Sequence, residues 1–498
     1  MDTLGSLVTG FATSLTAGNL LIVLLGVLIG TVIGVLPGLG PTAAIALLLP
    51  ATVGMDMVPS LIFLAGIYYG AMYGGSTTSI LVNIPGEAAS VITCIDGYQM
   101  AQQGRAGAAL GMAAFGSFIG GTLGVLAVML ISPVLAEAAL KFGPPEMFAL
   151  LFFAFTCIGT LVGKSVSRGL LMAVLGLLLG VVGTDAIHGV DRFTFETLYL
   201  RDGIGLVPLA MGLFGLGEIF YNIERRGETG SILKVPKNLL PTREDWKQSI
   251  WPVIRGSGLG FGIGVLPGGM PAVASLMSYA VEKRVSKQPE RFGKGAIEGV
   301  AGPETANNAA TAGGFIPLLT LGIPTNSVLA LLLAALMLHG VTPGPLLLLK
   351  WPHVFWAVIA SMYIGNIMLL ILNLPLIGIF VQLLRVPYAI LSPLIIMFVL
   401  LGAYALNNSL ADVFMTLFFG VLGYLLKRFS FEPAPLVLAF VLGPMMEINL
   451  SKSLIMFNTG NPLYFFTRPI SGVLLALALV VLGLPFLRRL GGKVFHRS

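Results

Sequence analysis

Two clusters of polar residues lie inside long apolar stretches of this sequence. The first cluster combines hydroxyl, amide and glycine residues, namely Gly74, Gly75, Ser76, Thr77, Thr78 and Asn83. The second combines amide, hydroxyl and glycine residues, namely Asn307, Asn308, Thr311, Gly313 and Gly314. Hydroxyls, side-chain amides and backbone N–H groups donate hydrogen bonds that suit carboxylate oxygens. The two clusters therefore predict a binding site for a small organic anion.

The same region offers oxygen ligands for a cation. Carbonyl groups released at helix interruptions coordinate Na⁺ or H⁺ in secondary transporters, and Asn and Thr oxygens are suitable ligands too. Glu304 is an ionisable group at membrane depth, where such groups are costly and usually functional. We expect Glu304, Asn308 and Thr325 to bind a cation, Na⁺ or H⁺, whose movement would be coupled to that of the anion. An alternative role for Glu304 is to cap a half-helix. We expect no other cofactor and no further metal, because Cys94 and Cys157 have no metal-ligand spacing.

Proline and glycine interrupt the apolar stretches around these clusters. The sequence GVLPGLGP at 34–41 recurs as GVLPGGMP at 264–271. We also interpret residues 68–87, and 302–314 with 322–326, as interrupted segments. The residues expected to break or shape the helices are Pro37, Gly38, Pro85, Pro267, Gly268 and Pro324. Non-helical backbone at membrane depth survives only where it is buried or lines a wet cavity, so these segments predict re-entrant helical hairpins around a cavity.

The elements that must position these residues are membrane-spanning helices. Only 10% of the 498 residues are charged, 56% are hydrophobic, and the mean hydropathy is +0.94. This composition excludes a water-soluble globular protein. The apolar runs are continuous and lack the alternation typical of membrane β-barrel strands. Because runs of roughly 17–25 residues recur, we predict an all-α polytopic membrane protein with about 10–12 membrane segments plus hairpins.

The chain contains an internal repeat. The GVLPG motif occurs at 34–38 and again at 264–268, and the preceding glycines match as well. Further matches follow in order along the chain, ending with RFTF at 192–195 and RFSF at 428–431. Loops at matching positions differ in charge, which is the pattern of inverted repeats in secondary transporters. We predict a first membrane repeat over 1–223, a cytoplasmic linker over 224–248, and a second, inverted repeat over 249–498.

The basic residues predict how the chain is oriented. The first 104 residues contain no Lys or Arg, whereas twelve of the 28 basic residues lie between Arg225 and Lys294. The positive-inside rule therefore places the linker over 224–248 in the cytoplasm, together with the basic C-terminus. The net charge of +6 is explained by these loops, so we expect the lipid bilayer, and no nucleic acid, as a partner.

The polar motifs resemble a known family. YGAMYGGSTTSILVNIPGE at 69–87 and GPETANNAATAGGFIPLLTLGIP at 302–324, together with the doubled GVLPG, resemble the large, TctA-type membrane subunit of tripartite tricarboxylate transporters. The likeness covers nearly the whole chain. It implies a secondary carrier of the bacterial inner membrane that works with a small four-helix membrane subunit and a periplasmic solute-binding protein. It also implies import of citrate or other carboxylates by symport with a cation, with binding motifs at 74–85 and 304–311.

Two other functions were weighed against this carrier. An intramembrane enzyme is disfavoured, because no Ser or Cys nucleophile shares a plausible neighbourhood with a His and no HExxH motif occurs. We therefore expect no enzymatic activity. A gated anion channel is harder to exclude, since glycine-rich breaks also build selectivity filters. The substrate, the choice between elevator and rocking movements, and the formation of a homodimer are left open by the sequence.

Overall fold

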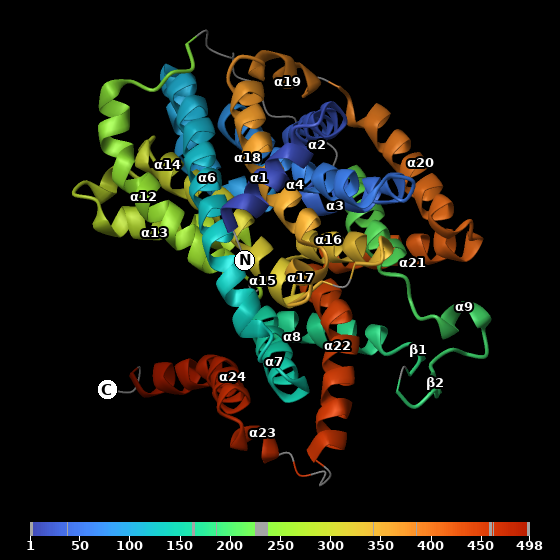
Figure 1. The fold of residues 1–498 in the computed structure, drawn as a ribbon. Coiled ribbons are helices and arrows are strands. Elements are labelled where there is room, and N and C mark those ends of the chain that lie inside the picture. The colour runs from blue at the N-terminus through green and yellow to red at the C-terminus, as the bar shows by residue number, and fades with distance from the viewer. Residues whose placement is uncertain are drawn as a thin grey trace.

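The computed structural model describes residues 3–36, 38–161, 165–185, 187–224, 238–341, 343–384, 386–457, 461 and 463–495. Within these residues the fold is almost entirely helical (Figure 1). Eight helical segments are long and apolar enough to cross a membrane, and four shorter apolar helices accompany them. The prediction of an all-α polytopic membrane protein is therefore confirmed. The predicted break at Pro37 and most of the predicted linker, residues 225–237, lie outside the described residues.

The first half of the chain contains four of the eight candidate membrane spans among the described residues. Its α-helices are α1 (Thr3–Ser14), α2 (Ala17–Val35), α3 (Pro41–Leu48), α4 (Met57–Val82), α5 (Val91–Met100), α6 (Ala106–Ala139), α7 (Pro144–Leu161), α8 (Val166–Gly180), α9 (Leu198–Arg201), α10 (Leu206–Ala210) and α11 (Gly217–Glu224). Short helical turns join some of them, namely η1 (Pro50–Thr52), η2 (Ala88–Ser90), η3 (Ala101–Arg105) and η4 (Met211–Leu216). Strands β1 (Gly183–Thr184) and β2 (Asp191–Arg192) form a two-stranded antiparallel sheet with Gly183 opposite Arg192.

The second half begins with a helix that carries a capping box at Thr242 and Asp245. Its elements are α12 (Arg243–Val265), α13 (Pro271–Val285), η5 (Pro289–Arg291), α14 (Glu298–Gly313), α15 (Phe315–Leu321), α16 (Ser327–Leu338), α17 (Leu347–Lys350), α18 (Pro352–Asn373), α19 (Ile377–Leu383), α20 (Tyr388–Asn407), α21 (Leu410–Arg428), α22 (Ala434–Phe457), α23 (Tyr464–Thr467) and α24 (Pro469–Phe495). The main core lies around α4, α16 and α18.

Glycines allow one pair of helices in each half to pack backbone against backbone. In the first half α2 lies on α4, and a Cβ atom at Gly30 would lie 2.3 Å from the carbonyl oxygen of Ile67. In the second half α12 lies on α14, and a Cβ atom at Gly260 would lie 2.2 Å from the carbonyl oxygen of Ala306. Small residues permit such close approach between membrane helices. We call these contacts the two glycine seams.

The glycine seams agree with the internal repeat residue by residue. Along α2 the contacts are made by Gly26, Gly30 and Gly34, which face Phe63, Ile67 and Ala71 of α4. Along α12 they are made by Gly256, Gly260 and Gly264, which face Gly302, Ala306 and Ala310 of α14. The glycines are 230 positions apart between the halves and their partners are 239 positions apart. The repeated sequence thus produces a repeated helix pair, while the inverted orientation of the halves stays a prediction.

The helices break at matching positions in both halves. Left-handed backbone occurs at Gly38 (φ 84°) and Gly268 (φ 76°), just before Pro41 and Pro271 begin α3 and α13. Left-handed residues also end α4 at Asn83 (φ 62°) and α15 at Gly322 (φ 72°). The non-helical backbone after these ends includes Pro85 and Pro324.

The interruptions are narrower than the sequence suggested. The segments 74–82 and 304–313 continue as regular α-helix within α4 and α14. Burial against neighbouring helices stabilises these segments although their polar residues are weak helix formers. Their hydroxyls bond to backbone carbonyls nearby in the same helix. Thr78 donates to the carbonyl of Gly75 (3.0 Å) and Thr311 to that of Asn307 (2.9 Å).

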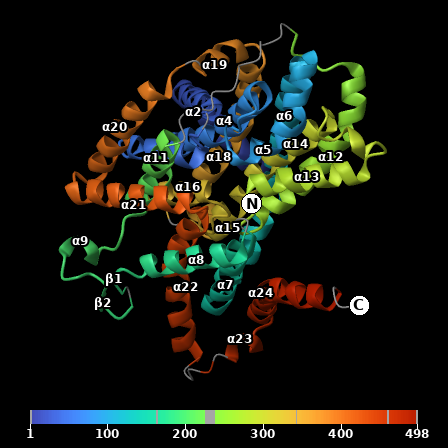
Figure 2. The ribbon, with the colours of Figure 1, turned by 180° about the vertical axis from the view of Figure 1, so that it is seen from behind.

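A buried carboxylate joins α5 of the first half to the second half. Asp96 is fully buried, and one of its oxygens accepts hydrogen bonds from the backbone N–H groups of Gly293 (2.8 Å), Gly295 (2.7 Å) and Ala296 (2.9 Å). Its other oxygen accepts from the hydroxyl of Tyr279 (2.9 Å) on α13. Figure 2 shows α5 beside α14 in the same region. Asp96 therefore fixes the α13–α14 connection onto α5.

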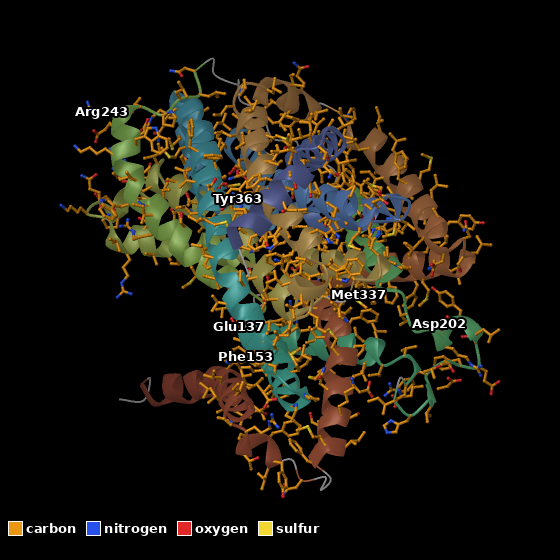
Figure 3. The ribbon with its side chains drawn as sticks, in the orientation of Figure 1. Glu137, Phe153, Asp202, Arg243, Met337 and Tyr363 are labelled. Carbon is orange, nitrogen blue, oxygen red and sulfur yellow. The ribbon has the colours of Figure 1, made fainter. Side chains whose placement is uncertain are left out.

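The charged ends of the molecule are separated. Arg243, at the start of the basic helix α12, and Asp202, in the excursion that carries β1, β2 and α9, lie on opposite sides of the fold (Figure 3). The views in Figure 1 and Figure 2 agree on this separation. Of the long apolar helices, α2, α4, α6 and α18 lie between these two ends (Figure 1).

We expect Gly260→Ala to destabilise the protein by about 1–3 kcal/mol, because its Cβ would overpack the seam between α12 and α14. Gly262→Ala on the same helix is the matched control, since a Cβ atom there meets no atom within 4 Å. It should be neutral or stabilising by up to about 1 kcal/mol, because alanine favours a helix more than glycine does. Thermal unfolding of the detergent-purified variants measures both effects. If Gly260→Ala and Gly262→Ala shift Tm equally, close packing of α12 on α14 at Gly260 is not what stabilises the protein.

Candidate functional site

A pocket of about 390 Å³ lies where the helix breaks of the two halves come together. Its volume is in the range of small-molecule sites in proteins. The first half contributes the residues before and at the start of α3 and η2, and the second half contributes those at the start of α13 and α16. These lining residues are Gly38, Gly40, Pro41, Thr42, Ala43, Pro85, Gly86, Glu87, Ala88, Ala89, Met270, Pro271, Ala272, Asn326, Ser327 and Val328.

The two halves supply equivalent residues to this pocket. Glu87 accepts a hydrogen bond from the backbone of Ala89 and caps η2, whereas Asn326, 239 positions later, accepts from the backbone of Leu329 (3.0 Å) and caps α16. The hydroxyls of Thr42 and Ser327 form a hydrogen bond of 3.0 Å between the halves. Equivalent segments of the two halves therefore line the pocket, and the equivalent helix caps are a carboxylic acid, Glu87, and an amide, Asn326.

Helix N-termini give part of the pocket a positive potential. Helices α3, α13 and α16 all begin at pocket residues. The first N–H groups of a helix have no partner within the helix, and the helix dipole adds partial positive charge at that end. Such ends bind carboxylates and other anions. This wall of the pocket can hold an anion without a basic side chain.

Tyr68 is a pocket residue that the sequence did not single out. It is buried on α4, lines the pocket, and accepts a hydrogen bond from the side-chain amide of Asn326 (3.1 Å). Its ring packs near those of Tyr69 and Phe315. Tyr68 precedes the glycine-rich motif and would be found only by asking which α4 residues face the broken helices.

A second wall of the pocket carries charged residues that sequence reasoning also missed. Lys427 of α21 forms an ion pair with Glu218 of α11, and both line the pocket together with Glu432. Lys427 is the only Lys, Arg or His that lines this pocket among the described residues. It lies at the end of an apolar helix, where the sequence alone suggests a topological charge.

The predicted substrate-binding residues do not line this pocket. The residues of α4 at 74–78 and those of α14 at 307–311 are buried, and none lines the pocket described above. Ser76 and Thr77 instead line a cavity of about 10 Å³, which holds about one water molecule. Asn83 ends α4 with a left-handed backbone and also lies outside the pocket wall.

The paired glycines allow the capping segments to approach the helices. A Cβ atom at Gly75 would lie 2.8 Å from Cγ of Glu87. A Cβ atom at Gly314 would lie 2.7 Å from Oγ1 of Thr325. Gly74 and Gly313 in turn belong to the glycine seams, facing Thr31 and Phe261. These glycines therefore determine how closely the capping segments approach the helices, and none of the four glycines lines the pocket.

Glu304 connects the two halves in the buried region beside α4. Its carboxylate is buried and accepts hydrogen bonds from Ser76 (2.6 Å) on α4, from Thr93 on α5 and from Ser117 (3.4 Å) on α6. All three donors come from the first half, while Glu304 belongs to the second. The amide nitrogen of Asn308 donates to the backbone carbonyl of Glu304 (3.1 Å).

Several buried polar atoms near Glu304 and the helix breaks lack partners in the described structure. They are both amide atoms of Asn307, Oδ1 of Asn308, Oγ1 of Thr325 and Oε1 of Glu87. Each buried atom of this kind costs about 1–3 kcal/mol unless it is satisfied. Unsatisfied buried oxygens commonly mark the position of a water molecule or an ion.

We expect Asn326→Ala to lower stability by about 0.5–2 kcal/mol, because α16 loses its N-cap. Asn326→Ser is the matched control, since its hydroxyl can still cap the helix although the bond to Tyr68 is lost. Thermal unfolding of the purified variants distinguishes them. The same loss of stability in both variants would mean that capping is not what Asn326 contributes.

Comparisons with known proteins agree with this picture. No solved structure matches the chain. An "Uncharacterized 52.8 kDa protein in TAR-I ttuC' 3'region" of Agrobacterium vitis is 50% identical over 498 residues, 99% of each chain. An "Uncharacterized protein in TAR-II ttuC' 3'region" of the same organism is 52% identical over 231 residues, 46% of this chain and 95% of that one. The family described as "Tripartite tricarboxylate transporter TctA family" matches residues 20–438. The chain therefore belongs to the TctA family, which is a family of transporter subunits and not of enzymes.

Proposed function

We propose that the chain carries tricarboxylates or other carboxylate anions across the bacterial inner membrane, driven by an ion gradient. The observation that carries this proposal is the pocket lined by the helix breaks of both halves, where α3, α13 and α16 have their N-termini. Helix N-termini and hydroxyl groups bind an anion through partial charges and hydrogen bonds. The family supports the transport of tricarboxylates in particular.

The charges around the pocket support cation coupling. Three carboxylates line it, those of Glu87, Glu218 and Glu432, against the single ammonium group of Lys427. Burial raises the pKa of Glu87 to about 8 and raises the pKa of Glu432 as well, so both acids take up protons more readily than an exposed carboxylate does. H⁺ or Na⁺ bound at these acids lowers the negative charge that an entering organic anion meets. The two acids therefore favour symport of the anion with a cation.

The coupling ion is assigned to Glu304, Asn308 and Thr325. Glu304 is buried between the halves, and Asn308 and Thr325 each have an oxygen without a partner in the described structure. An acid and neutral oxygens of this kind suit either a proton or Na⁺. The predicted substrate contacts of Asn307 and the hydroxyl cluster on α4 remain a prediction, because none of these residues lines the pocket.

The repeated helix pairs support an alternating-access mechanism with inverted halves. Each half contains a glycine seam followed by breaks at the pocket. In transporters built from inverted repeats the site lies near the midplane between the halves, which then move against each other. We further propose that the periplasmic solute-binding protein delivers the substrate and that the small four-helix membrane subunit completes the tripartite assembly, in line with the family.

Uptake of radiolabelled citrate and smaller carboxylates into right-side-out membrane vesicles tests the proposal. The vesicles come from cells that express the chain with its two proposed partner subunits. We expect saturable uptake that accumulates substrate when a Na⁺ or pH gradient is imposed. Equilibration without accumulation would indicate a channel. No uptake of any carboxylate, with all three subunits present, would reject the proposed function.

If Glu304 carries the coupling proton, Glu304→Gln should abolish accumulation driven by a pH gradient, because the amide cannot be ionised. Uptake down the substrate gradient should persist. Glu137→Gln is the control, since Glu137 is an exposed acid on α6 (Figure 3) and should transport like the wild type. Vesicle uptake with and without a pH gradient measures the difference. Unchanged coupling would assign Glu304 a structural role.

A further inference from the structure

One ion pair, Lys427–Glu218, lines the pocket. Lys427 lies in the last turn of α21, and its ammonium group pairs with Glu218 of α11. The two side chains are 33% and 19% exposed, and both line the pocket. A pair that only joined two helices would be equally effective outside the pocket. The position of this pair therefore gives a pocket ligand direct access to Lys427.

A neighbouring ion pair on the same two helices shows the contrast. Arg428 and Glu224 also join α21 to α11, at 3.7 Å, with side chains 55% and 43% exposed. Neither residue lines the pocket. The Arg428–Glu224 pair thus joins the two helices at the surface, whereas the Lys427–Glu218 pair faces the pocket where the anion is proposed to bind.

Glu218 is held mainly by Lys427. Its other hydrogen bond comes from the side-chain amide of Asn222 at 3.4 Å, a long contact. The same amide group donates to the backbone carbonyl of Gly38 at 3.2 Å, so Asn222 is shared with the broken helix before α3. A carboxylate of the anion that displaced Glu218 would therefore give Lys427 a new partner of the same chemical kind.

We propose that Lys427 binds a carboxylate of the transported anion, and that Glu218 is the resting partner which the anion displaces. This inference rests on the proposed function. The exchange keeps Lys427 paired, while Glu218, which is 19% exposed, keeps the long hydrogen bond from Asn222 and its remaining contact with water. The substrate carboxylate must therefore bind Lys427 more strongly than Glu218 does. A second carboxylate on the same anion meets the N-termini of α3, α13 and α16. The favoured substrates are therefore anions with two or more carboxylates.

The proposal predicts opposite effects for the two members of the pair. Lys427→Gln removes the counter-ion of the substrate, so the citrate concentration for half-maximal uptake should rise about tenfold or more. Glu218→Gln removes the competitor, so the same concentration should fall about two- to fivefold. A purely structural ion pair would give changes in the same direction. Initial rates of citrate uptake in the vesicles described above provide both values.

Matched variants separate recognition from folding. Lys427→Arg keeps the positive charge and should retain most of the affinity, whereas Arg428→Gln and Glu224→Gln should leave the half-maximal concentration unchanged. Gel filtration of each solubilised variant reports whether it folds. If Lys427→Gln does not fold, the fall in half-maximal concentration for Glu218→Gln supports the proposal by itself, and its absence overturns it.

The outcomes distinguish this inference from the proposed function. If the wild type takes up citrate saturably and the two variants shift in the same direction or not at all, Lys427 is not the substrate contact and only this inference fails. If the wild type takes up no carboxylate, the proposed function fails and the role of Lys427 fails with it. Uptake of monocarboxylates with equal affinity would contradict the preference for two or more carboxylates.

Discussion

Direct contact between helix backbones is the constraint on which the rest of this structure depends. Within a bilayer there is little hydrophobic gain in bringing two helices together, so they associate through close packing and polar contacts. Gly30 and Gly260 provide that packing by leaving room for the carbonyl groups of Ile67 and Ala306. These seams hold α4 against α2 and α14 against α12, and so they also position the helix breaks that follow.

The breaks produce the cavity and its binding groups together. A helix that ends in the membrane leaves N–H and carbonyl groups without partners, and these groups must face protein, water or a ligand. In this protein Glu87 and Asn326 satisfy some of them as caps. The remaining N-terminal groups of α3, α13 and α16 are directed to a shared space. The positive wall of the pocket thus follows from how the helices are interrupted and needs no basic side chain.

The sequence predicts the parts of this fold that local signals encode. Apolar runs identify the spans, and the doubled GVLPG motif identifies the repeat and the breaks at Gly38 and Gly268. The sequence could not show that the polar residues of α4 and α14 stay helical, because glycine, serine, threonine and asparagine are weak helix formers locally and the packing that stabilises these helices comes from distant segments. It also could not place Lys427 beside Glu218, which is 209 positions away and belongs to another helix.

The buried hydrogen bonds of Asp96 link α5 to the α13–α14 connection, and this link determines which helices can move together. Three backbone N–H groups and a tyrosine hydroxyl fasten the α13–α14 connection to a helix from the other half. Separating α14 from α5 would leave a fully buried carboxylate without its four donors, which is costly. The alternating access proposed above would therefore move α5 together with α14, and the moving unit would contain residues from both sequence halves.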